Sequence, residues 1–170
     1  MKPTAEILLT VETFHELGET IDAANYLLKE YNLQHPFLKE VVLRERAKPN
    51  FILLTTEGKF GAQQIIRIPE NCFEFDLVLM LNLLAHEMIH VEQKSHLTLF
   101  PDKNEREWQA YYEMIFHKVY PQIPEASSFH KKSFANKGLE YYHRMGKNSD
   151  LQLKYAEQKK EVDDFISTLL

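Results

Sequence analysis

Residues 83–91 read Leu-Leu-Ala-His-Glu-Met-Ile-His-Val and contain two histidines, His86 and His90, one helical turn apart. Residues four apart lie on the same face of an α-helix, so both imidazoles can reach one metal ion. Glu87 lies roughly 100° around such a helix from His86, where a general base for a metal-activated water must stand. Neither proline nor glycine occurs in residues 73–94, which predicts an uninterrupted helix through the motif.

Two segments rich in strand-forming residues precede this helix. They are residues 51–56 (Phe-Ile-Leu-Leu-Thr-Thr) and residues 62–68 (Ala-Gln-Gln-Ile-Ile-Arg-Ile). Residues 57–61 between them include two glycines, which is typical of a hairpin connection. The second segment is either an ordinary sheet strand or an edge strand that adds a substrate chain by main-chain pairing. Residues 41–46 are compatible with a strand or with part of a short helix.

Helical patterns occupy most of the remaining chain. Residues 4–31 have helical periodicity, with Gly18 as the expected break between two helices. Asn71, with Glu74 three residues later, resembles a capping arrangement that would start the motif helix. That helix should end at about Lys94.

Asp102, with Glu105 three residues later, predicts the start of the next helix, which should end before Pro121. Two more helices are expected at about 128–145 and 151–169. The predicted fold class is therefore α+β. A small antiparallel β-sheet and the motif helix should be followed by an all-helical C-terminal half.

The length and composition of the chain limit its class. Its 170 residues suit one domain, with a helical N-terminal region (1–45), a catalytic core (50–120) and C-terminal helices (125–170). A net charge of −5 gives no basic surface for nucleic acid. Cys72 is the only cysteine, so an intrachain disulfide is excluded.

The apolar segments of the chain do not suggest export or membrane insertion. Acidic residues interrupt the N-terminal apolar stretch, which argues against a secretory signal. The most apolar run, residues 77–85, is too short to span a bilayer. We therefore expect a soluble, cytoplasmic protein without a membrane partner.

A catalytic zinc site needs a third protein ligand besides His86 and His90, and two residues are candidates. His96 follows His86 by ten residues, the spacing of a longer histidine motif. That motif needs a glycine where this chain has Gln93, and glutamine is poorly suited to a positive φ. Glu107 lies in the second turn of the following helix, which a short connection can return antiparallel to the motif helix. Turn chemistry favours Glu107.

The motif and the later segment Glu107-Trp-Gln-Ala-Tyr111 together resemble the gluzincin metallopeptidases, and the chain length is similar to that of the minigluzincins. The resemblance covers about residues 50–120. It implies that His86, His90 and Glu107 bind Zn²⁺ and that Glu87 is the general base. The family often has an acidic residue four positions after the glutamate ligand, where this chain has Tyr111. Another group must therefore accept the free imidazole N–H.

The resemblance implies a metallopeptidase that hydrolyses peptide bonds of a protein or peptide substrate with a zinc-activated water. A donor for the developing oxyanion is also expected, and the side chains that qualify by chemistry are His117, His130, His143, Tyr111, Tyr112, Tyr141 and Tyr142. The resemblance implies a donor on a helix after the last ligand, which favours His130 and His143. Two alternatives remain open. One is a metzincin-like hydrolase that uses His96, and the other is a zinc-stabilised interaction module without turnover. Because a purely structural site needs no base, Glu87 argues against the second alternative.

Overall fold

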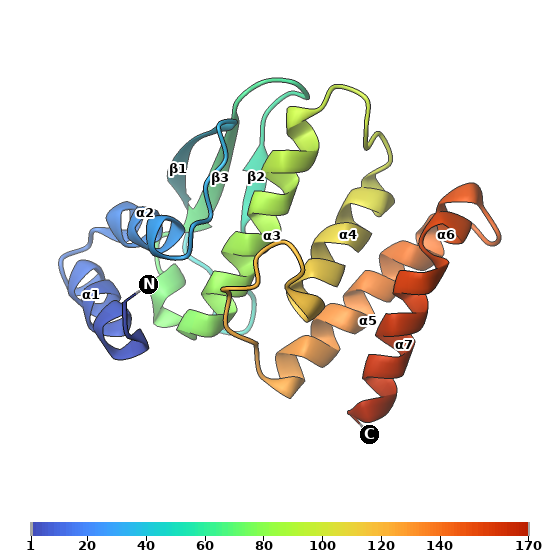
Figure 1. Ribbon diagram of the computed structural model, residues 1–170. Coiled ribbons are helices and arrows are strands. Elements are labelled where there is room, and N and C mark those ends of the chain that lie inside the picture. Colours follow the sequence, from blue (N-terminus) through green and yellow to red (C-terminus); the bar gives the residue numbers. More distant parts are fainter. Residues whose placement is uncertain (1, 170) are drawn as a thin grey trace.

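The motif helix, α3 (Leu77–Ser95), lies between a small sheet and a group of C-terminal helices in the computed structural model, which describes residues 2–169 (Figure 1). Residues 1 and 170, the outermost positions of the predicted domain, lie outside the described residues. The predicted α+β class is confirmed. Among the described residues, no helix combines the length and apolar character needed to cross a membrane.

The start of α3 differs from the prediction. Asp76 is the N-cap residue, and its carboxylate accepts a hydrogen bond from the Leu79 backbone N–H at 2.8 Å. Asn71 instead precedes the short 3₁₀ helix η1 (Cys72–Glu74), and its side-chain amide bonds the backbone of Ala47. The predicted Asn71 cap was therefore wrong, because that side chain satisfies a distant loop rather than the helix end.

The sheet is mixed rather than antiparallel. It contains β1 (Leu38–Arg44), β2 (Thr55–Glu57) and β3 (Gln64–Pro69) in the order β1-β3-β2. The expected hairpin gives the antiparallel pair of β2 and β3, but β1 joins β3 in parallel, with Val41 opposite Ile66. Parallel pairing requires a long crossover and leaves no local turn signal in the sequence, so the antiparallel prediction failed for this pair.

The strand order also corrects the proposed edge strand. Since β3 pairs with strands on both sides, residues 62–68 cannot add a substrate chain. The strand near α3 with one unpaired side is β2, which is shorter than predicted because residues 51–54 do not join the sheet. Residues 41–46, compatible with a strand or a short helix, lie mostly in β1, which forms the other edge of the sheet, so residues 1–45 are not wholly helical.

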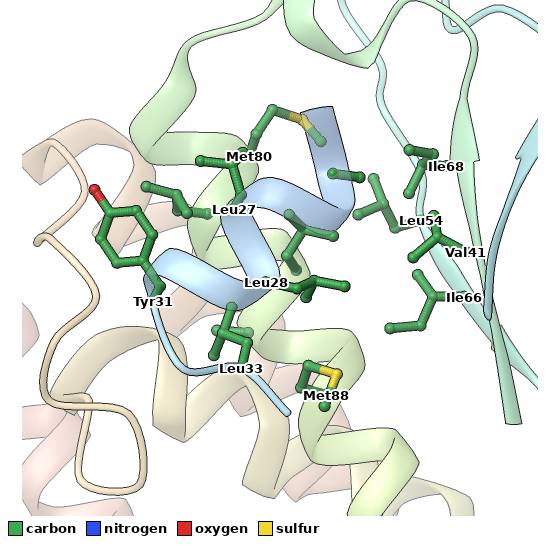
Figure 2. Packing of buried hydrophobic residues seen from close by; sticks show 14 of the residues in the cluster. Leu27, Leu28, Tyr31, Leu33, Val41, Leu54, Ile66, Ile68, Met80 and Met88 are labelled. Atoms are coloured by element: carbon green, nitrogen blue, oxygen red, sulfur yellow. The ribbon is translucent and has the colours of Figure 1, made fainter. Parts of the chain in front are cut away.

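The N-terminal helices α1 (Thr4–Glu16) and α2 (Thr20–Glu30) pack with the sheet against one side of α3. Gly18 separates them with a φ of +75°, a conformation that glycine adopts without a steric penalty. Figure 2 shows the core that these elements enclose. Its labelled members are Leu27, Leu28, Tyr31, Leu33, Val41, Leu54, Ile66, Ile68, Met80 and Met88.

The C-terminal helices form a second core on the other side of α3. They are α4 (Lys103–Phe116), α5 (Ser128–Arg144), α6 (Asp150–Lys154) and α7 (Ala156–Thr168). Trp108 of α4 is fully buried among them, and Leu83 of α3 contacts both cores. The predicted last helix is divided at Tyr155, and Ser149 rather than Asp150 caps its first part.

Candidate metal centre

Helix α3 presents His86 and His90 toward α4, at the boundary between the two cores. Both side chains are buried, and their Nε2 atoms lie 3.1 Å apart. Two nitrogen atoms this close, both facing one point, are what the spacing of four residues predicts for a shared ligand. The predicted pairing of these two histidines is therefore present.

Helix α4 brings Glu107 to the same point. Asp102 caps this helix as predicted, and its carboxylate accepts a hydrogen bond from the Glu105 N–H at 2.9 Å. The fully buried Ala110 permits α4 to approach α3 closely. One carboxylate oxygen, Glu107 Oε2, lies 3.5 Å from His86 Nε2 and 3.6 Å from His90 Nε2.

The distances among these three atoms fit a bound metal ion. Ligands at 2.0–2.1 Å in a tetrahedral zinc site lie about 3.3 Å from one another, and the three separations here are 3.1, 3.5 and 3.6 Å. Two imidazoles and one carboxylate also form a ligand set used by catalytic zinc. Within residues 2–169, no fourth histidine, cysteine or carboxylate joins the group.

The Glu107 carboxylate interacts with both imidazoles through hydrogen bonds and charge. Burial disfavours the charged form of His90, but the hydrogen bond to Glu107 and the nearby charge of Glu87 outweigh it and raise its pKa. Burial likewise opposes ionisation of Glu107, but hydrogen bonds from His86 and His90 hold the pKa of this carboxyl well below its usual range. Glu107 is therefore a carboxylate at neutral pH, the state that binds a metal.

Glu87 lies beside this group rather than in it, as its place on the helix predicts. Its side chain is buried, and Oε2 accepts a hydrogen bond from the Thr56 hydroxyl at 2.7 Å. The same hydroxyl lies 3.0 Å from the Glu87 carbonyl oxygen. Thr56 belongs to β2, so the sheet holds the candidate base at a fixed place next to the two histidines.

The three candidate ligands and Glu87 line an open cleft of about 430 Å³. One wall is residues 52–56, from β2 and the segment before it. Basic side chains line the cleft as well, and they are Lys94, Lys103 and Arg106. The cleft therefore combines a metal-type cluster, a carboxylate that can carry a proton and space for a ligand.

Two tyrosines on the helical side complete the lining. The ring of Tyr111 packs edge-on against His86 at a centroid distance of 4.7 Å, and Tyr141 of α5 stacks on Tyr111 at 5.9 Å. Burial, followed by the charge of Glu107, raises the pKa of Tyr111, so its hydroxyl keeps its proton at neutral pH. Both phenols were recognised in the sequence only as chemically suitable donors, because nothing local places α5 beside α4.

The structure does not bring the other predicted residues to this cleft. His130 packs between the rings of Phe129 and Phe134, and His143 is exposed near the end of α5. Neither residue lines the cleft, whereas Tyr141 of the same helix does, so the two proposed oxyanion donors do not reach the candidate site. His96 is exposed at the C-terminal end of α3 and lies outside the cluster.

Two partners of the histidines were not expected from the sequence. Each imidazole faces the cluster through Nε2 and makes its other contact through Nδ1. Nδ1 of His90 lies 2.8 Å from Gln93 Oε1, and Nδ1 of His86 lies 3.2 Å from the thioether sulfur of Met114. Gln93 stands one turn after His90, a spacing that could have indicated the contact. Nothing in the sequence indicates that Met114 contacts His86.

Comparison of the chain with protein-family models, with curated protein sequences and with solved structures found no match. The function of the protein is therefore inferred from the geometry of this cleft.

Proposed function

We propose that the protein is a zinc-dependent peptidase that hydrolyses peptide bonds in a protein or peptide substrate. The observation that carries this proposal is the convergence of His86, His90 and Glu107, with Glu87 beside them, in an open cleft. A structural zinc site uses four protein ligands, whereas a catalytic site uses three and keeps one position open. The three-residue cluster among the described residues supports the catalytic type.

In this proposal His86, His90 and Glu107 hold the zinc ion, which supplies Lewis acidity to a water and to the substrate carbonyl when it is bound. Glu87 accepts a proton from the attacking water and delivers it to the leaving amine. The Thr56 hydroxyl donates to the Glu87 carboxylate and orients it for that transfer. Because Thr56 donates to only one carboxylate oxygen, the other oxygen is left for the water.

The substrate is proposed to bind along residues 52–56. These residues line the cleft, and β2 is at an edge of the sheet, so a substrate chain can pair with main-chain groups there. On the opposite wall, the hydroxyls of Tyr111 and Tyr141 are the proposed donors to the developing oxyanion. Extended main-chain binding between two walls is typical of recognition of an unfolded or flexible peptide segment.

The metzincin-like alternative receives less support. It requires the chain to leave the helix at Gln93 so that His96 can return to the metal. Helix α3 continues to Ser95, and His96 is exposed. Glu107 is therefore the third ligand in the proposed mechanism.

The proposal is tested with Glu87→Gln. Glutamine has nearly the same shape but cannot accept the proton from water at neutral pH. The variant should keep its metal and its fold while peptide hydrolysis falls on the order of 10²-fold or more. Hydrolysis is measured with unfolded casein and a peptide library, and metal content is measured on the same preparations.

Two results would contradict the proposal. One is a wild-type protein that carries a full complement of zinc and cleaves no member of the library, which would favour an interaction module. The other is a Glu87→Gln variant that cleaves as fast as wild type, because the proton transfer would then not depend on this carboxylate.

A further inference from the structure

We infer that Gln93 is a positioning residue for the metal centre, linking the ligand His90 to the C-terminal helices through a directed chain of hydrogen bonds. This inference rests on the proposed metal centre and concerns how these hydrogen bonds affect its affinity for the metal. It also explains what replaces the acidic residue that is absent at Tyr111. The relevant contacts lie on the helical side of α3, and neither Gln93 nor Gln109 lines the substrate cleft.

The first link fixes the protonation of His90. Gln93 is almost completely buried, and its Nε2 lies 3.1 Å from the Arg106 carbonyl oxygen and 3.3 Å from Gln109 Oε1. Both neighbours are acceptors, so the amide nitrogen must face them and Oε1 must face the imidazole. An amide oxygen only accepts, so His90 Nδ1 carries the proton that spans the 2.8 Å to Gln93.

The consequence appears at the other nitrogen of the ring. With Nδ1 protonated in a neutral imidazole, Nε2 has the free lone pair that a metal needs. This Nε2 is the atom that faces His86 and Glu107. Gln93 therefore selects the tautomer of His90 that binds metal and fixes the plane of its ring.

The chain continues from Gln93 to a buried carboxylate. Gln109 accepts from Gln93 and donates to the Tyr155 hydroxyl, which donates to Glu105 Oε1 at 2.7 Å. Glu105 is almost fully buried, and the Lys154 ammonium lies 2.8 Å from the same oxygen. Each donor thus points away from the metal site and toward an anion, an arrangement in which successive hydrogen bonds strengthen one another.

The other histidine ligand lacks this support. His86 Nδ1 faces the sulfur of Met114, which is a weak acceptor. The strong acceptor Gln93 therefore orients the His90 ring more firmly than Met114 orients the His86 ring. Removing Gln93 should therefore weaken metal binding even though Gln93 never touches the metal.

The test measures the dissociation constant of Zn²⁺ by competition with a chromophoric chelator, together with the visible absorption of the Co²⁺-loaded protein. Gln93→Met removes the acceptor at similar side-chain size and should weaken Zn²⁺ binding on the order of 10- to 100-fold and alter the Co²⁺ spectrum. Gln93→Glu restores an acceptor for His90 but loses the donation to Arg106 and Gln109. The Zn²⁺ affinity of Gln93→Glu should return toward that of wild type, although the lost hydrogen bonds should keep its melting temperature below that of wild type.

Gln152→Met is the matched control. Gln152 donates to the Tyr142 carbonyl oxygen at 2.9 Å and accepts from the Asn148 N–H at 3.1 Å, so its loss also removes amide hydrogen bonds. It lies on α6 outside the chain from His90 to Glu105. Its substitution should lower the melting temperature without changing the affinity for Zn²⁺ or the Co²⁺ spectrum.

Several outcomes would overturn the inference. Unchanged Zn²⁺ affinity in Gln93→Met would do so, as would a Gln93→Glu variant that binds as weakly as Gln93→Met. If Gln93→Met does not fold, Tyr155→Phe removes a single hydroxyl from the chain, and wild-type affinity in that variant would refute the link to Glu105. A wild-type protein that binds no Zn²⁺ overturns the metal centre and this inference together. Tight wild-type binding with unaffected variants overturns the inference alone.

Discussion

On the sheet side of α3, Thr56 donates a hydrogen bond to the candidate base Glu87. On the helical side, Glu107 and Gln93 contact the two histidines. In the proposed mechanism the sheet side therefore handles the proton, and the helical side holds and tunes the metal. Figure 1 shows the two groups of elements on opposite sides of α3. One helix can carry both proposed functions because its faces rest on different cores, so that each function should be separable by mutation.

The largest effect is expected on the helical side, for Glu107→Ala. The variant removes one of the three proposed ligands, so that only the two imidazoles remain to hold the metal. Its affinity for Zn²⁺ should fall by more than the 10- to 100-fold typical of changes in outer partners. Isothermal titration with Zn²⁺ measures this loss.

His96→Ala is the control for that variant, because His96 is exposed and lies outside the cluster. It should bind Zn²⁺ as wild type does. Loss of zinc in His96→Ala with retention in Glu107→Ala would reverse the assignment of the third ligand.

The next effect tests whether the helical side also contributes to chemistry. Tyr141→Phe removes a hydroxyl that lines the cleft and leaves the stacking on Tyr111 in place. If this hydroxyl stabilises the oxyanion, kcat should fall about 10²- to 10³-fold with little change in KM or zinc content. Steady-state kinetics on one peptide substrate separate these quantities. An unchanged kcat would leave Tyr111 as the remaining phenolic candidate, which Tyr111→Phe examines.

The pH dependence of metal binding tests the electrostatics of the cluster. In the metal-free protein the pKa of His90 is raised above its ordinary value, chiefly by Glu107 against the opposing effect of burial. The stability that protonated His90 contributes is therefore complete below about pH 6.5 and is lost as the pH rises through the raised pKa. The lowered pKa of Glu107 acts in the opposite direction, so its contribution is complete above about pH 4.5 and is lost as the pH falls through that pKa.

Since zinc must displace the proton of His90, its affinity should fall about tenfold per pH unit below the raised pKa of this residue. Chelator competition at pH 6, 7 and 8 measures the slope. Equal affinity at the three values would contradict the proposed coupling.

The smallest effect is expected on the sheet side, for Thr56→Val. Valine keeps the shape of threonine but does not donate to Glu87, so the carboxylate loses its orientation while the zinc ligands remain. We expect kcat to fall about tenfold, a small part of the 10²- to 10⁴-fold that a positioned general base contributes, with unchanged zinc affinity. Altered zinc binding in this variant would show that the two sides of α3 are not independent.

The helical elements near the motif were largely predictable, because their signals are local. The spacing of His86, Glu87 and His90 sets their relative directions wherever an α-helix forms. The Asp102 cap was equally visible, and turn chemistry favoured Glu107 over His96. The C-terminal helix pattern was less complete, since the break at Tyr155 carries no glycine or proline signal.

Other features depended on contacts between distant segments. Glu113 is a helical glutamate, a residue type that usually faces solvent, yet it is buried and accepts hydrogen bonds from the Val119 and Tyr120 N–H groups. Glu105 was expected to serve the helix cap, but its side chain is the end of the chain that starts at His90. In both cases the helix that carries the glutamate was predicted, but the group that its side chain contacts was not.

Local spacing is sufficient to put two imidazoles on one face of a helix with a carboxylate beside them, because 3.6 residues per turn set these directions without help from the rest of the chain. The mixed sheet, the edge position of β2 rather than β3, and the presence of Tyr141 rather than His130 or His143 in the cleft became visible only in the folded molecule. These features depend on how helices and strands rotate and pack against one another. That packing is set by the combined burial of many distant side chains, which no local pattern encodes.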